Sequence, residues 1–461
     1  MKLLIIGAGP GGYETAVAAS RRGLDVTIVS DGPVGGTCLN EGCIPTKSFC
    51  RNAEVMDTLA QASVFGIDNL SYSFDFKKVL ERKNEVVDRL KSGIEFLLEG
   101  KNIRLLYGKA VFKDAHTVEV TDSESNVTQV TADKIIVATG SCSASLPIPG
   151  NDLEGVITSK EILELEEVPE RLCVIGAGVI GLEFASIFKS FGSQVNVVEY
   201  CKEILPRFDT DLAKRLKQAL SKRDIVIDTS SQVRGIKKTA DALEVSYIKK
   251  DEEIKVVADK VLMAVGRRPN VNSANLEAAG IEFTPRGIKV DDNMRTNVPD
   301  IYAIGDVTGG MMLAHVATFQ GLKALADILG EERAIDFSVV PAAVFTTPEV
   351  AVTGLTEEEC KERGYKIKCL KSFFRANGKA LSMNEPEGYC KLIVYAGDEG
   401  SEAGMEYGRI LGCHLLGAHA SDLIQEITAL MNTKAVISDF QNVIHAHPTL
   451  TEVLQSAAHS F

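Results

Sequence analysis

The chain contains the same glycine motif twice, each time between an apolar strand pattern and a helical pattern. Residues 2–30 contain a strand, the spacing G-x-G-x-x-G, a helix and a second strand, and residues 171–199 repeat this plan. The motif glycines are Gly7, Gly9 and Gly12 in the first copy and Gly176, Gly178 and Gly181 in the second. In such a unit the first glycine forms a tight turn, the second lets the backbone approach a pyrophosphate, and the third lets the helix pack closely. Two copies therefore predict two Rossmann-like dinucleotide-binding units.

The residue that follows the second strand distinguishes the two units. In the second copy Glu199 lies 23 positions beyond Gly176, where a carboxylate accepts both hydroxyls of an adenosine ribose and repels a 2′-phosphate. This residue favours NAD over NADP. In the first copy the same offset from Gly7 falls on Ser30, and Asp31 follows it. Either residue can bind the ribose, and the sequence leaves both open.

A third segment, residues 298–321, completes the first unit. It reads as a strand that ends in Gly305 and Asp306, followed by a helix. An aspartate at a strand end accepts hydroxyls from an extended polyol such as the ribityl chain of a flavin, and a helix N-terminus favours an anionic reduced flavin. The simpler alternative for Asp306 is a helix cap. We expect His315 to serve packing or orientation, because no Cys or His lies at metal-ligand spacing from it.

Charge, apolar patterning and cysteine content exclude several classes of protein. A net charge of −13 without a basic stripe argues against a nucleic-acid partner. No apolar run reaches the roughly 18–20 residues that a membrane helix needs. Ten cysteines in 461 residues do not form a disulfide scaffold. Because strand residues begin at Lys2, we expect no signal peptide, and we expect a reducing, cytoplasmic setting in which any disulfide is catalytic or sensory.

Two cysteines lie five positions apart in the segment GGTCLNEGCIPTK, residues 35–47. A regular helix separates such positions by roughly 8.6 Å between Cα atoms, whereas a disulfide needs about 4.4–6.8 Å. If Cys38 and Cys43 bond, the chain between them does not form an undistorted helix. Gly42 and Pro45 permit an irregular start followed by a helical turn. A thiol in that first turn gains thiolate character from the helix dipole.

Three interpretations of this pair compete. A zinc site needs about four ligands, and the chain offers no second cysteine pair of matching spacing. Two buried free thiols fit the spacing alone. The pair lies some 25 residues after the first glycine turn, beside the expected flavin site, and this position favours a redox-active disulfide.

The whole chain resembles the class I pyridine nucleotide–disulfide oxidoreductases, a family of flavoenzymes. The resemblance rests on GGTCLNEGCIPTK, both glycine turns, ATG at 138–140, GRRPN at 266–270, GD at 305–306 and HAHPTLTE at 445–452. It implies an α/β fold with two Rossmann-like dinucleotide-binding domains and a C-terminal α+β dimerisation domain, as in glutathione reductase. The implied division is an FAD-binding domain at 1–143 and 264–337, an NAD-binding domain at 144–263, and an interface domain at 338–461. The last contains an acidic stretch, 397–408, that reads as a mobile hairpin loop.

The resemblance also implies roles for the residues around the thiols. Cys38 corresponds to the interchange thiol that reacts with the substrate, and Cys43 to the charge-transfer thiolate against the flavin. Lys47 corresponds to the lysine beside flavin N5, paired with a glutamate that is Glu183 here. Further positions that match cofactor contacts of the family are Gly36, Thr37, Thr139, Gly140, Gly266 and Ala314.

His447 and Glu452 resemble the acid–base dyad of the family. Imidazole titrates near neutral pH, and a carboxylate on its second nitrogen fixes the tautomer and raises its basicity. Their spacing fits a residue that enters a helix and another in the following turn. His445 is a competing candidate, but only His447 has the Pro-Thr-Leu-Thr-Glu continuation. In the family this dyad reaches the thiols of the other subunit, so the resemblance implies a homodimer.

Within the family, HAHPTLTE and MMLAHVA are most similar to the branch that oxidises dihydrolipoamide and reduces NAD. The implied cofactors are FAD and NAD, and the implied partner is the lipoylated carrier domain of a 2-oxo acid dehydrogenase or glycine cleavage complex. The alternatives are a reductase of another small disulfide, similar to glutathione reductase, and a non-enzymatic flavoprotein redox sensor.

Overall fold

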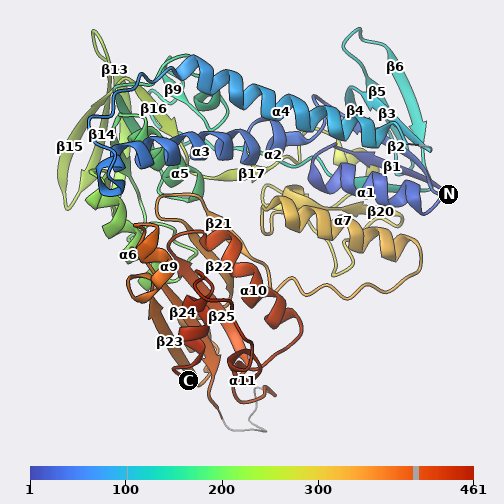
Figure 1. The fold of residues 1–461 in the computed structure, drawn as a ribbon. Helices are drawn as coiled ribbons and strands as arrows, with labels where there is room; N and C mark the ends of the chain where they lie inside the picture. Colours follow the sequence, from blue (N-terminus) through green and yellow to red (C-terminus); the bar gives the residue numbers. More distant parts are fainter. Residues whose placement is uncertain (101, 398–403) are drawn as a thin grey trace.

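A computed structural model describes residues 1–100, 102–397 and 404–461. Its largest sheets are two parallel sheets and one antiparallel sheet, each of five strands. Figure 1 shows the parallel sheets at opposite sides of the molecule, with the antiparallel sheet packed below them. The predicted α/β architecture with a C-terminal α+β unit is confirmed. Among the described residues, no helix is long and apolar enough to cross a membrane.

The first parallel sheet contains the first glycine motif. Its strands, in spatial order, are β20 (Ile301–Ala303), β7 (Lys134–Val137), β1 (Lys2–Ile6), β2 (Asp25–Ser30) and β3 (Ile103–Tyr107). Alternate residues of β1 enter different cores: Leu3 and Ile5 pack with helices α1 (Pro10–Arg21) and α7 (Ala314–Ile328), and Leu4 and Ile6 pack on the opposite face. Since both faces are covered, the strand reads as a continuous apolar run.

The second parallel sheet repeats this arrangement around the second glycine motif. Its strands are β12 (Val226–Asp228), β11 (Gln194–Val198), β10 (Arg171–Ile175), β16 (Lys260–Met263) and β9 (Val156–Ile157). Helices α5 (Val179–Ser190) and α6 (Thr210–Lys222) follow β10 and β11.

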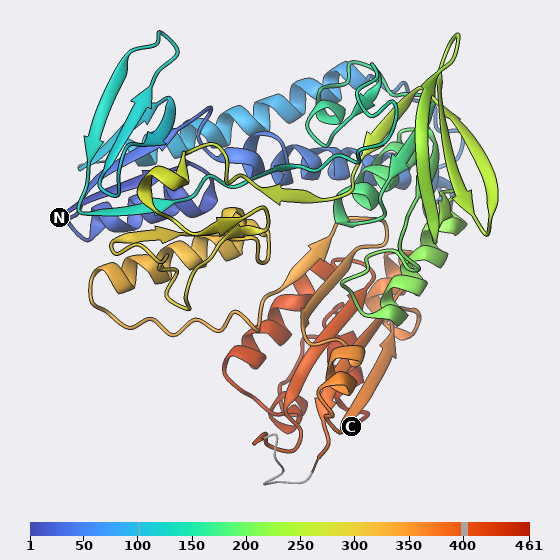
Figure 2. The ribbon, with the colours of Figure 1, turned by 180° about the vertical axis from the view of Figure 1, so that it is seen from behind.

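Each parallel sheet is accompanied by a three-stranded antiparallel sheet, and Figure 2 shows these two small sheets at opposite ends of the molecule. They are β4 (Lys109–Phe112), β5 (Thr117–Thr121) and β6 (Val127–Thr131), and β13 (Ser231–Lys238), β14 (Leu243–Lys249) and β15 (Glu252–Ala258). Short ribbons pair β8 (Ser141–Ser143) with β17 (Arg267–Pro269) and β18 (Phe283–Thr284) with β19 (Gly287–Ile288). The 3-10 segments are η1 (Ala62–Phe65), η2 (Glu161–Glu164), η3 (Leu276–Ala279), η4 (Gly305–Thr308) and η5 (Phe374–Ala376).

The C-terminal sheet is antiparallel. Its order is β21 (Ala342–Val344), β22 (Val350–Gly354), β25 (Ile410–Leu416), β24 (Tyr389–Tyr395) and β23 (Ile367–Phe373), with helices α8 (Glu357–Glu362), α9 (Gly378–Ser382), α10 (Ala420–Asn432), α11 (Ile437–Gln441) and α12 (Glu452–Ala458). The expected hairpin at 397–408 connects β24 with β25, which pair antiparallel. Residues 398–403 of that stretch lie outside the described residues.

A buried ion-pair network joins the C-terminal sheet to the second unit. Lys391 of β24 is 1% exposed and contacts Asp209, at 2.7 Å, and Glu357, at 2.6 Å. Asp209 is fully buried and precedes α6, where its carboxylate caps the first turn. A buried ammonium is tolerated only with such partners, so the network fixes how the second unit docks on this sheet.

Helices α2 (Gly36–Asn40), α3 (Cys43–Ala60) and α4 (Phe76–Leu98) connect the units. In Figure 1, α4 runs across the top of the molecule from one parallel sheet to the other. Phe49 of α3 and Phe76 of α4 pack with Phe191, close to α5, at ring-centroid distances of 5.8–6.1 Å. The same apolar core includes residues of β21 and β22. Helix α3 is therefore held from both sides, which fixes the thiol-bearing residues at its start.

Candidate active site

Both glycine motifs open onto one cavity of about 2340 Å³. Gly9 and Gly178 precede α1 and α5, and neither helix start has a side-chain cap. A Cβ on Gly178 would meet nothing within 4 Å, and one on Gly9 would meet only Gly36 Cα at 4.0 Å. The open backbone at both helix starts therefore fits two pyrophosphate groups. The volume exceeds the roughly 300–1,000 Å³ of an ordinary ligand pocket.

The first and third glycines serve the turn itself. Gly7 has φ +115°, and a Cβ there would lie 2.2 Å from the Ala138 oxygen. A Cβ on Gly181 would lie 2.0 Å from the Gly176 oxygen, so this glycine permits helix packing. Gly181 is not among the described residues that line the cavity.

Most sequence-predicted residues do line this cavity. They are Gly7, Gly9, Gly12, Ser30, Asp31, Gly36, Thr37, Cys38, Cys43, Lys47, Thr139, Gly140, Gly176, Gly178, Glu183, Glu199, Gly266, Gly305, Asp306 and Ala314. Ser30 is buried at the end of β2, and Asp31 is exposed. The geometry leaves both available to a ribose.

Glu199 is held in place by backbone amides at the end of β11. Its Oε2 accepts the Ala177 N–H at 2.6 Å, and its Oε1 accepts the Cys201 N–H at 2.7 Å. The carboxylate is only 7% exposed and lines the cavity beside the second glycine turn. This fixed acceptor fits the predicted contact with ribose hydroxyls.

The segment with the two cysteines breaks between two helices, as a bond between Cys38 and Cys43 would require. Cys38 belongs to α2, and Cys43 is the first residue of α3. Between them Gly42 has φ −148° and ψ −111°, outside helical values. Both cysteines carry free thiols in this structure. The predicted irregular start is confirmed.

The two thiols differ in acidity because they interact with each other. The hydrogen bond from Cys38 is the largest cause that lowers the pKa of Cys43, to about 7, and the Lys47 ammonium adds to it. The same hydrogen bond, together with burial, raises the pKa of Cys38. The proton of the pair therefore stays on Cys38, and the charge resides on Cys43.

Lys47 and Glu183 form the ion pair that the resemblance implies. Lys47 Nζ lies 3.0 Å from both carboxylate oxygens of Glu183, whose side chain is 5% exposed. Burial opposes the charged lysine, but Glu183 outweighs it and the pKa of Lys47 is raised. Sequence reasoning missed Phe345, whose ring centroid lies 4.3 Å from Lys47 Nζ and whose N–H donates to Glu183. Phe345 is 162 positions from Glu183, and one apolar residue at the end of an apolar run gives no sequence signal of such a contact.

Asp306 takes part in a polar network with Ser141 and Arg267, two residues to which the sequence alone assigned no role. It lies in η4 and accepts a hydrogen bond from the Ser141 hydroxyl. Arg267 donates to that hydroxyl at 2.7 Å and to the Thr37 hydroxyl at 3.5 Å. Ser141 directly follows ATG, and Arg267 lies in GRRPN, so proximity to these motifs was the available signal. His315 lines the cavity and contacts the Pro341 carbonyl at 2.8 Å.

His447 and Glu452 contact each other as predicted, through His447 Nδ1 and Glu452 Oε1 at 2.9 Å. The expectation that His447 enters a helix is wrong, because α12 begins only at Glu452. Pro448 disfavours the helical conformation for the residue before it. The Thr449 N–H and then the contact with His447 lower the pKa of Glu452, and the carboxylate stays ionised. His445, the competing histidine, is buried against Glu426.

The structure does not bring this dyad to the thiols within one chain. Neither His447 nor Glu452 belongs to the described residues that line the cavity, and the His447 side chain is 79% exposed. An imidazole left open to solvent, with its orientation already fixed by a carboxylate, is available to a second molecule.

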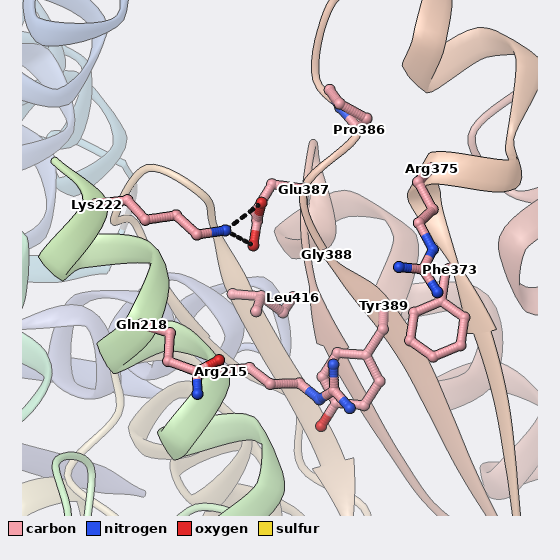
Figure 3. A pocket seen from close by; sticks show the side chains of 10 residues that line it. All are labelled: Arg215, Gln218, Lys222, Phe373, Arg375, Pro386, Glu387, Gly388, Tyr389 and Leu416. Carbon is pink, nitrogen blue, oxygen red and sulfur yellow. Dashed lines mark hydrogen bonds and ion pairs between the residues drawn. The ribbon is translucent and has the colours of Figure 1, made fainter.

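A separate pocket of about 330 Å³ lies between α6 and the C-terminal sheet (Figure 3). The Arg215 guanidinium lies 4.6 Å from the Tyr389 ring centroid, and Lys222 pairs with Glu387 at 3.1 Å. Its described lining includes none of the sequence-predicted residues. The large cavity is therefore the candidate active site.

The fold and the thiol-bearing cavity define a nucleotide-dependent thiol–disulfide oxidoreductase. Residues 1–321 match the family described as pyridine nucleotide-disulphide oxidoreductase, and residues 340–458 match the dimerisation domain of that family. The chain belongs to the pyridine nucleotide-disulphide oxidoreductase family.

Curated relatives and solved structures agree with this assignment. A dihydrolipoyl dehydrogenase of Bacillus subtilis (strain 168) is 40% identical over 457 residues, 99% of this chain and 95% of the relative. One of Geobacillus stearothermophilus is 39% identical over 456 residues, with the same coverage. The chain is also similar to the HOCl-induced flavoprotein disulfide reductase RclA from Escherichia coli in its Cu(II) complex. That match has TM-score 0.88 and 30% identity and covers 100% of this chain and 99% of the other.

Proposed function

We propose that this chain is a dihydrolipoyl dehydrogenase, which oxidises dihydrolipoamide to lipoamide and reduces NAD. The observation that carries the proposal is the asymmetric thiol pair in a cavity shared by two dinucleotide turns. Its support is the similarity, over 99% of the chain, to proteins named for that activity. FAD and NAD are the cofactors, and when bound they take the electron pair from the reduced thiols and carry it away as hydride.

The residues that would hold these cofactors follow from the cavity. We assign the first glycine turn, Ser30 or Asp31, and Asp306 with its Ser141 partner to FAD. The second glycine turn and Glu199 are assigned to the nicotinamide nucleotide. Lys47 and Glu183 then offset charge where hydride is transferred.

The chemistry of the thiols follows from their acidity. His447 takes a proton from dihydrolipoamide, and the substrate thiolate attacks Cys38 Sγ of the oxidised pair. The Cys38–Cys43 bond breaks, and Cys43 leaves as a thiolate. The second substrate thiol then closes the lipoamide ring and releases Cys38 as a thiol, so two electrons pass from the substrate to the pair.

We also propose that the enzyme is a homodimer in which His447 of one copy serves the thiols of the other. The dimerisation domain of the family and the separation of the dyad from the cavity within one chain support this assembly. The proposed domains are the FAD-binding domain at 1–143 and 264–337, the NAD-binding domain at 144–263 and the interface domain at 338–461. The proposed partner is a lipoylated carrier domain.

A steady-state assay of the FAD-loaded protein tests the function. We expect rapid oxidation of NADH with lipoamide, and little with NADPH or with oxidised glutathione. Preference for glutathione would overturn the substrate assignment and favour a glutathione reductase-like enzyme. If NADH produces the long-wavelength absorbance of a thiolate beside the flavin but no disulfide is turned over, the protein is a redox sensor.

A further inference from the structure

Phe345 connects the C-terminal domain to the Lys47–Glu183 ion pair through two contacts, and to Cys50 of the same helix as Lys47 through a third. Its ring centroid lies 4.3 Å from Lys47 Nζ. Its N–H donates to Glu183 Oε1 at 3.0 Å, and its carbonyl accepts the Cys50 thiol at 3.5 Å. Phe345 directly follows β21 and lines the large cavity. The C-terminal domain therefore contributes to the cavity onto which both glycine motifs open.

The chain just after Phe345 is anchored where all three domains meet. The Thr347 N–H donates to the Ser186 hydroxyl at 3.1 Å, and its carbonyl accepts from Arg223 at 3.2 Å. Arg223 also contacts Asp57 of α3 at 2.7 Å. These bonds restrict the backbone that places the Phe345 ring, so the ring is held as part of the domain junction.

The position of the Lys47 ammonium determines the field at the reactive thiol. Lys47 lowers the pKa of Cys43, and Glu183 raises it. Because the two charges act in opposite directions, a small displacement of the ammonium changes their net effect. Glu183 holds the ammonium through its carboxylate, and the aromatic face of Phe345 gives it a second favourable contact.

We propose that Phe345 is a positioning residue that fixes the Lys47 ammonium one helical turn from Cys43 and thereby favours the thiolate form of that cysteine. The C-terminal domain thus contributes to the thiol site of its own chain, in addition to its part in subunit contact. The proposal rests on the proposed function only in assigning Cys43 as the thiolate that faces the flavin.

The test compares substitutions that alter the ring but keep the backbone contacts. Phe345→Leu and Phe345→Met both remove the aromatic face and differ little from each other in volume, and Phe345→Tyr keeps it. Phe373→Leu is the matched control, because Phe373 is also half-buried beneath a cation, Arg375, at 4.8 Å, but lies outside the cavity lining. Each FAD-loaded protein is reduced by two electrons, and the long-wavelength thiolate–flavin absorbance is titrated from pH 5 to 9.

The expected result is a shift of this titration to higher pH in both non-aromatic variants. Their thiolate signal near pH 6 should fall about three- to tenfold, the factor that a cation–π contact of ordinary strength supplies. Phe345→Tyr and Phe373→Leu should titrate as the wild type does. Unshifted titrations in Phe345→Leu and Phe345→Met would overturn the proposal, as would an equal shift in Phe373→Leu.

The readout separates this proposal from the proposed function. If the wild type fails to turn over lipoamide but the non-aromatic variants shift the titration, the substrate assignment fails and the role of Phe345 stands. If turnover of lipoamide is normal and the titration of the non-aromatic variants does not move, the substrate assignment stands and the role of Phe345 fails. A melting temperature measured for each variant identifies any that has lost its fold. If Phe345→Leu does not fold, the titration of Phe345→Met tests the proposal alone.

Discussion

Replacing Cys38 by Ala should delay ionisation of Cys43 to higher pH. The Cys38 hydrogen bond is the largest cause that lowers the pKa of Cys43 to about 7 from 9.0. Alanine cannot donate it, and the thiolate loses its principal partner. Because a thiol is charged above its pKa, raising that pKa shrinks the thiolate population at neutral pH.

The size of the effect is bounded by two values of the Cys43 pKa, the one in the wild type and the ordinary one of a free thiol. At pH 7 a thiol with a pKa of about 7 is about half ionised, and one with the ordinary value is about 1% ionised. Lys47 remains in the variant and still favours the thiolate. We therefore expect the thiolate population at pH 7 to fall by about five- to fiftyfold.

The assay is the pH titration of long-wavelength absorbance in the FAD-loaded protein. Cys38→Ala cannot form the disulfide and is titrated directly, whereas the wild type is first reduced by two electrons. Cys38→Ser keeps a hydroxyl donor, so the midpoint of its titration should lie between those of the wild type and Cys38→Ala. Cys142→Ala controls for loss of a thiol, since Cys142 is exposed and contacts Arg268 instead. If Cys38→Ala titrates like the reduced wild type, the hydrogen bond does not set the acidity.

Three further substitutions test other parts of the structure. His447→Gln should slow the dithiol half-reaction by about 10²–10⁴-fold and leave NADH-to-flavin transfer nearly unchanged in stopped-flow measurements; equal losses would remove His447 from the acid–base role. Glu199→Ala should weaken NADH binding, measured by titration, far more than FAD binding, and an unchanged NADH affinity would refute the ribose contact. Asp209→Asn should lower the free energy of unfolding in urea by about 3–5 kcal/mol, because it removes a charged partner from buried Lys391; a loss below about 1 kcal/mol would contradict the network. The pKa of Glu357, lowered to about 2 by Lys361 and Lys391, adds stability above its unfolded pKa near 4.5 that is lost as pH falls toward 2.

Features that depend on local backbone geometry were predictable from the sequence. Glycine was expected at position 7 because the tight turn gives it a φ of +115°, a backbone conformation that residues with a side chain rarely adopt. Gly42 and Pro45 indicated that the chain could break between Cys38 and Cys43, and a disulfide between these two cysteines would require that break. Both arguments use only neighbouring residues, for which the covalent chain already fixes the possible distances.

Contacts between distant segments required either the resemblance or the structure. Lys47 and Glu183 are 136 positions apart, and only the family pattern connected them. Phe345 and Lys391 had no such pattern: one reads as an ordinary apolar residue and the other as a surface lysine in a strand. Their partners come from other domains, so their roles depend on docking that hydrophobic periodicity does not encode.

The helix break bears on which sulfur of the proposed disulfide is the better leaving group. It places Cys43 at the start of α3, beside Lys47, and leaves Cys38 in α2 as the proton donor. In thiol–disulfide exchange the sulfur with the lower thiol pKa is the better leaving group. In the proposed attack at Cys38, that sulfur has no S–H left to donate, and the Lys47 ammonium is the group that still stabilises the departing Cys43 thiolate. The irregular turn that would permit the proposed bond therefore also places the stabilising ammonium on the Cys43 side of it.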